Sequence, residues 1–139
     1  MAALSIAAAS VVYQSGPVAT DQLAGEAFIA GAAVYQANNG TWLKAQCDGT
    51  AIEAGANNTG MALATADAAN ARVSIALPGA EVTVGTGTAG VVYVIARNAG
   101  SFTPVADMLS TDKVTPVAIG IGSSKLQLTR VYNAGSVLA

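Results

Sequence analysis

After Gly25 the chain consists of short β-rich runs separated by turn residues, and apolar and polar residues alternate in residues 72–77 and 80–84. Alternation with a period of two predicts half-buried β-strands. A short run at residues 26–29 comes first and ends at Gly31. The predicted strands that follow, given by residue number, are 32–36, 41–46, 60–65, 72–77, 80–84, 91–96, 101–105, 115–121 and 125–132, with one short helical turn at 107–112. Gly, Asn and Pro separate these runs every eight to twelve residues or so, which is typical of all-β domains. The pattern therefore predicts an all-β fold, a compact β-barrel or β-sandwich of short strands.

The two halves of this pattern resemble each other. A strand that ends in Tyr35, an Asn/Gly turn and a strand with Trp42 are followed later by Tyr93, another such turn and Phe102. The two tyrosines are 58 residues apart and the other two aromatic residues are 60 apart. These similarities predict an internal pseudo-repeat, although any all-β chain can show such similarities between its parts.

Residues 1–23 differ from the rest of the chain. Residues 5–14 could form a strand, and an alanine-rich helix over residues 1–10 is the competing interpretation. The β-branched residues Val11 and Val12 favour the strand, and Gly16-Pro17 interrupts the chain after it. We therefore expect an extended N-terminal arm and linker over residues 1–23, followed by a β-domain over residues 24–139.

The fraction of charged residues in the chain is low. Of 139 residues, 53% are hydrophobic and only 10% are charged, against about 25% in a typical soluble domain. Either small polar residues such as Ser, Thr and Asn form a weakly polar surface, or partner subunits cover much of it. The second option indicates an assembly.

Several classes of catalysis lack the residues that they need. The sequence has no histidine and a single cysteine, Cys47, which excludes Ser-His-Asp or Cys-His nucleophilic catalysis and a zinc-thiolate cluster. The acidic residues form no dense cluster of the kind that binds calcium; they are Asp21, Glu26, Asp48, Glu53, Asp67, Glu81, Asp107 and Asp112. We expect no enzyme, no catalytic residue, no cofactor and no metal.

Gly85 to Gly90 spell G-x-G-x-x-G, the fingerprint of dinucleotide-binding loops. That fingerprint needs a helix directly after the loop, so that the helix N-terminus faces the pyrophosphate. Here the loop is followed by the β-branched residues 91–95, which favour a strand. We therefore expect a flexible β-turn and no bound cofactor.

Charge and hydropathy also limit the partners. The net charge is −2 and the six basic residues are scattered, whereas nucleic-acid binding needs clustered phosphate contacts. No basic residue precedes Lys44, so a secretory signal is not expected. The apolar run over residues 1–12 is too short to span a membrane. We expect a soluble protein made in a reducing cytoplasm, with no direct nucleic-acid or membrane contact.

One segment gives a family resemblance. Residues 24–35 (AGEAFIAGAAVY) resemble the start of the small capsid cement, or head decoration, proteins of tailed bacteriophages. Residues 59–64 and 117–121 are similar to a small-residue strand of that family, and residues 89–94 (AGVVYV) are similar to a second copy of the first motif. The resemblance covers about residues 24–131.

The resemblance implies a β-domain bound to the outside of a phage head, made in the host cytoplasm. Such proteins commonly form homotrimers that bridge neighbouring major capsid subunits and stabilise the shell. Residues 1–23 could lie as an added strand on a neighbour, and a disordered terminus is the competing interpretation. If the arm is an added strand, removal of residues 1–16 weakens attachment while the domain stays folded. The expected capsid or subunit contacts are Leu4, Ile6, Val11, Val12 and Tyr13.

Two other functions remain open. A phage tail or baseplate structural module would also be all-β and oligomeric, and its copy number in the virion would be low. A carbohydrate-binding module would present exposed aromatic side chains, and its glycan binding would be lost on Trp42→Ala.

Overall fold

The structure is a computed structural model that describes residues 4, 6–47, 58–105, 115–122 and 124–129. Within that part of the chain it is built of strands and one 3₁₀ turn, so the predicted all-β class is confirmed. The elements are η1 (Ala8–Ser10), β1 (Val12–Ser15), β2 (Val18–Leu23), β3 (Ala33–Gln36), β4 (Trp42–Lys44), β5 (Thr59–Ala62), β6 (Arg72–Ala76), β7 (Glu81–Thr83), β8 (Val92–Ile95), β9 (Phe102–Pro104), β10 (Pro116–Gly120) and β11 (Lys125–Leu128).

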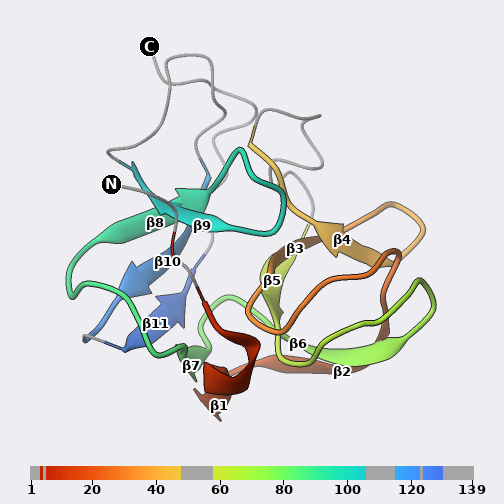
Figure 1. Cartoon of the computed structure of the whole chain (residues 1–139), viewed down its shortest axis with the longest axis horizontal. Helices are drawn as coiled ribbons and strands as arrows, with labels where there is room; N and C mark the ends of the chain where they lie inside the picture. Colours follow the sequence, from red (N-terminus) through yellow and green to blue (C-terminus); the bar gives the residue numbers. More distant parts are fainter. Residues whose placement is uncertain (1–3, 5, 48–57, 106–114, 123, 130–139) are drawn as a thin grey trace.

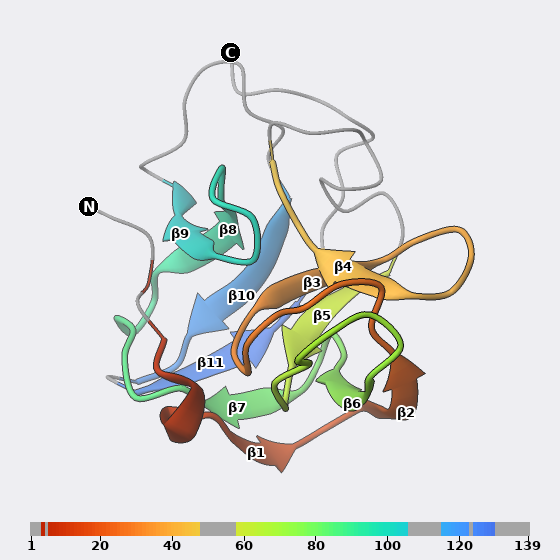
Figure 2. The same cartoon turned by 45° about the vertical axis from the view of Figure 1, so that its right-hand side comes forward.

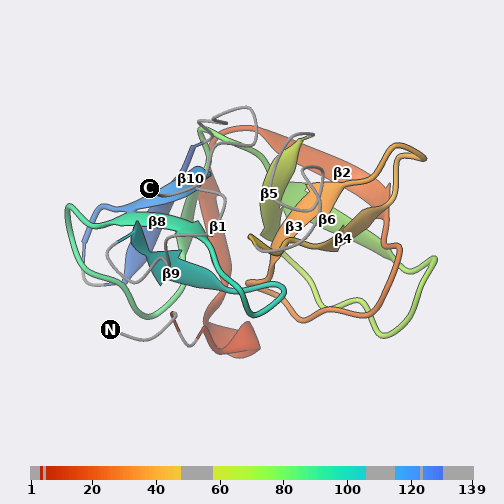
Figure 3. The same cartoon turned by 90° about the horizontal axis from the view of Figure 1, so that it is seen from above.

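The strands form two antiparallel sheets (Figures 1 and 2). One has five strands in the order β2-β6-β5-β3-β4, and the other has six in the order β1-β7-β11-β10-β8-β9. We call the five-stranded part, residues 18–76, the first half, and residues 81–128 the second half. Figure 3 shows the two halves side by side when the molecule is seen from above.

The two halves share one topology, so the expected pseudo-repeat is present as a repeated strand order. If β1 is set aside, the order β7-β11-β10-β8-β9 in the second half matches β2-β6-β5-β3-β4 in the first. Glycines with positive φ occur at equivalent turns: Gly31 and Gly90 precede β3 and β8, and Gly40 and Gly100 lie in the β3–β4 and β8–β9 turns. Such backbone conformations favour glycine, so the repeat includes turn geometry.

The main core lies between the two sheets. Tyr35 and Met61 of the first half pack there with Tyr93, Phe102 and Leu126 of the second half. A smaller core lies inside the first half, where Val34 and Trp42 belong to its buried cluster. Successive side chains of a strand point to opposite faces, so β3 supplies Tyr35 to one core and Val34 to the other.

The N-terminal region differs from the predicted arm. Residues 12–15 pair with β7, and residues 18–23 pair with β6 as an edge strand of the first half. The boundary predicted at residue 23 therefore does not separate an arm from the domain, since both strands belong to its sheets. The sequence did not predict β2. The residues around Asp21 are polar, and a register irregularity between Ala19 and Gln22 breaks the alternation of the strand there.

Some predictions lie outside the described residues. They are the helical turn at 107–112, the end of the last strand at 130–132, and the acidic residues Asp48, Glu53, Asp107 and Asp112. In the described part, no helix is long and apolar enough to cross a membrane.

Candidate docking groove

The two halves meet where the β8–β9 turn reaches the first half. The Gly100 amide donates a hydrogen bond to the Ala45 carbonyl at 2.9 Å, and the Gly100 carbonyl accepts one from the Ala33 amide at 2.9 Å. A Cβ at Gly100 would lie 3.1 Å from Cγ and Cδ of Lys44. Glycine thus lets the turn backbone reach β3 and β4 while the aliphatic stem of Lys44 packs on it.

A groove of about 500 Å³ opens beside this junction. It continues into a second hollow of about 230 Å³ that shares Ile29, Ala32, Gly100 and Ser101 with it. Ile29 is 56% exposed, the largest exposure among the exposed large hydrophobic side chains of the described residues. We call the surface of these two hollows the docking groove, because binding sites are usually concave and lined by apolar residues with a few polar groups.

The docking groove has little net charge. Its ionisable lining residues are Lys44 and Asp67, which have opposite signs. The nearby Glu26 carboxylate accepts a hydrogen bond from the Lys44 amide at 3.0 Å and so fixes the β4 backbone at the groove wall. These features suit a partner segment that is apolar and close to neutral.

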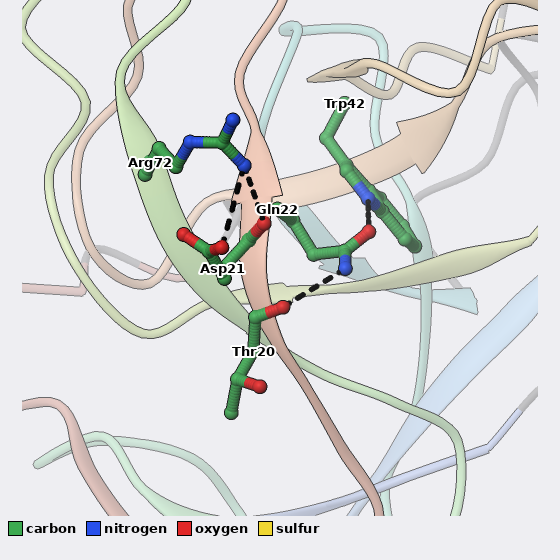
Figure 4. Close-up of polar contacts among 5 residues, drawn as sticks. All are labelled: Thr20, Asp21, Gln22, Trp42 and Arg72. Carbon is green, nitrogen blue, oxygen red and sulfur yellow. Dashed lines mark hydrogen bonds and ion pairs between the residues drawn. The ribbon is translucent and has the colours of Figure 1, made fainter.

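A polar cluster lies on the bulged strand β2, where this strand meets Trp42 of β4 (Figure 4). The Trp42 indole donates to Oε1 of Gln22 at 3.0 Å, and Nε2 of Gln22 donates to the Thr20 carbonyl at 3.0 Å. Nη1 of Arg72 lies 3.4 Å from the Asp21 carboxylate and donates to the Asp21 carbonyl at 3.2 Å. These groups bond to one another, and the cluster therefore stabilises the bulge.

The residues expected to contact a capsid fall into two groups. Leu4, Ile6 and Val11 are partly buried and pack against the chain's own main core. Val12 and Tyr13 of β1 are 51% and 42% exposed. Val12 and Tyr13 therefore face outward. Leu4, Ile6 and Val11 pack inward, and Leu4 and Ile6 also line the second hollow of the docking groove.

The structure also shows where the other residues singled out in the sequence lie. Gly85–Gly90 forms the loop between β7 and β8, and a strand follows it. Cys47 is buried in the main core. Trp42 is 2% exposed, so loss of glycan binding on Trp42→Ala would report loss of packing instead of loss of a sugar platform. Among the described residues no cluster of acidic or cysteine side chains could hold a metal ion.

Sequence reasoning did not find the docking groove. Its walls come from segments that are far apart in the sequence and meet only through the packing of the two halves. The first hollow is lined by residues 27–29, 32, 44, 65–67 and 99–101, and residues 4, 6, 31 and 102 also line the second. The one local signal was Ile29, an aliphatic residue within the turn region before β3.

No protein-family model matches the chain, and no curated protein or solved structure matches it either.

Proposed function

We propose that this protein is a structural component of a phage virion, which binds the outside of the capsid and bridges neighbouring major capsid subunits without catalysis. The observation behind the proposal is the placement of the two motif copies that resemble cement proteins. Residues 24–35 run from the end of β2 to β3, and residues 89–94 lead into β8. The motif thus occupies the same place in both halves, between the first strand and the second, as a repeated structural element would.

The docking groove is the surface that we assign to the capsid. Its exposed Ile29 and balanced charge suit an apolar segment of a major capsid subunit. A single groove of this size binds weakly, and attachment at many lattice positions, or through several copies held together, would raise the effective affinity. A homotrimer at the capsid surface remains part of the proposal.

Copy number in purified virions tests the proposed location. We expect quantitative mass spectrometry to find the chain at a level near that of the major capsid protein. A few copies per virion would favour the tail or baseplate alternative. Absence from virions would contradict the proposal and favour a binding module.

A matched pair of variants tests the surface. Ile29→Ser removes the exposed side chain in the docking groove, and Ile121→Ser removes another exposed isoleucine, 40% exposed, that lines neither part of it. Both variants should stay folded, because both side chains are already in contact with water. The protein is removed from purified phage heads and each variant is then added back. We expect Ile29→Ser to lower the occupancy of the heads and Ile121→Ser to leave it unchanged. Equal occupancy for the two variants would exclude the groove as the capsid contact.

A further inference from the structure

The two halves complete their sheets in different ways. In the first half the chain itself joins the two edges: Ala24, just after β2, bridges Trp42 of β4, and the Gly25 amide donates to the Trp42 carbonyl at 2.7 Å. In the second half the equivalent carbonyl is that of Phe102, and it accepts from the Leu4 amide at 2.7 Å. The N-terminal segment thus stands where the first half uses its own strand.

The same segment reaches the other edge of the second half. After η1 it becomes β1, in which Val12 lies opposite Thr83 and Tyr13 opposite Val82 of β7. Figure 1 shows this red segment descending from the level of β9 to β7. We call residues 4–15 the closing segment, because they connect the two edges of the second half that do not pair with each other.

Glycines in the body of the domain make room for the closing segment. A Cβ on Gly31 would lie 2.6 Å from Cγ2 of Ile6 and 3.1 Å from a methyl group of Val11. A Cβ on Gly85 would lie 3.0 Å from Cβ of Ser10. Contacts under 3.0 Å are not tolerated without a shift, so the surface at Gly31 is shaped for this segment.

The closing segment is nevertheless a separate piece of chain. None of the residues of η1 or β1 is buried, and the first charged side chain in the sequence is Asp21. Its contacts with the rest of the domain are backbone hydrogen bonds, apolar packing and a side-chain hydrogen bond from Nε2 of Gln14 to Oγ1 of Thr83 at 2.9 Å. A second copy offers the same partners. Gly16 and Pro17 connect the closing segment to β2, and the φ of Gly16 is +98°. A proline favours extended backbone in the residue before it, so an opened hinge is accessible.

We propose that the closing segment is exchanged between copies of this chain, so that residues 4–15 of one copy complete the second half of another. Exchange keeps every contact of the segment and changes only the hinge at Gly16, the general basis of domain swapping. The partner is a second copy of this chain, and the inference is independent of the proposed capsid binding because it needs no capsid.

Split cysteines in the full chain test the exchange. One chain has Val12→Cys, and the other, with an isotopic label, has Thr83→Cys. Directly opposite residues of antiparallel strands lie about 4.5–5.5 Å apart at Cα, within the range that a disulfide bridges. Since neither chain contains both cysteines, a bond between these positions forms only if the closing segment of one chain lies on the other.

The control replaces the second chain by Gln127→Cys, an exposed position on β11 that pairs with Glu81 and not with β1. A chain with both Val12→Cys and Thr83→Cys, oxidised at high dilution, checks that the bond forms within one copy. After mixing at high concentration, we expect about tenfold or more of the Val12–Thr83 heterodisulfide over the Val12–Gln127 control. A yield equal to the control, with the double variant bonding within its own chain, would overturn the exchange.

Discussion

The two halves of this molecule have the same strand order and different closures. The first half joins its own edges at Ala24 and Trp42, whereas the second receives a segment from the N-terminal end of the chain at Phe102 and β7. A repeated topology therefore does not require a repeated way of completing the sheet. The half that depends on a distant segment is the half whose stability can be coupled to another molecule.

The terminal strands β2 and β1 of the two sheets also differ. β2 has a bulge with Asp21 at a φ of +56° and an ion pair to Arg72. Bulges and charged side chains protect an edge strand against pairing with another chain. β1 (Val12–Ser15) is uncharged and fully exposed along its length, although it too has a register irregularity. The edge formed by the closing segment is therefore the less protected of the two.

The largest expected effect compares the aromatic residues at the two closures. Trp42 and Phe102 are 2% and 1% exposed. Replacement of either by alanine should lower the free energy of unfolding by about 3–5 kcal/mol, since each change removes a large buried ring and leaves a cavity. Urea denaturation measures both. A loss below about 1 kcal/mol for Trp42→Ala would mean that the small core of the first half does not stabilise the fold.

Removal of residues 1–15 should open the second half alone. The change takes away β1 and the packing of Leu4, Ile6 and Val11 against the main core. Three partly buried aliphatic side chains are worth about 2–4 kcal/mol together, so we expect a lower urea midpoint. We also expect faster hydrogen exchange in β7 and β9 than in β3 to β6.

The control for this truncation is the full chain with Val12→Ser and Tyr13→Ser, both at exposed positions of β1. It should keep the midpoint within about 0.5 kcal/mol, as is usual for surface substitutions. A truncated chain as stable as the full one would show that residues 4–15 do not close the second half.

The glycine-rich loop of the second half supplies the third test. A Cβ on Gly120 of β10 would lie 2.0 Å from the Thr88 carbonyl oxygen, and the Gly90 amide donates to the Gly120 carbonyl at 2.8 Å. Gly120→Ala should cost about 1–3 kcal/mol through overpacking. The matched control is Gly122→Ala, because a Cβ there meets nothing within 4 Å. Equal stability of the two variants would mean that the Gly85–Gly90 loop does not rest on β10.

The local sequence predicted most strands, but it did not predict the contacts between residues that lie far apart in the chain. Residues 32–36, 72–77 and 91–96 contain β3, β6 and β8 as expected. Residues 72–77 alternate, and residues 91–96 are a continuous apolar run bounded by turn residues, so local sequence is enough to predict both strands. β2 was hidden by its bulge. The closing segment and the docking groove depend on where the two halves pack, and no local pattern specifies that arrangement.

The smallest expected effect concerns the ion pair on the β2 edge. The side chains of Arg72 and Asp21 are 59% and 73% exposed, and exposed pairs contribute about 0–1 kcal/mol. Arg72→Ala should therefore lower stability by less than about 1 kcal/mol, and added salt should shrink the difference from the original chain because it screens the pair. The bulge at Asp21 remains in this variant, so size-exclusion chromatography should show no new oligomer. A new oligomer in Arg72→Ala would show that charge, more than backbone shape, protects the edge of the first half.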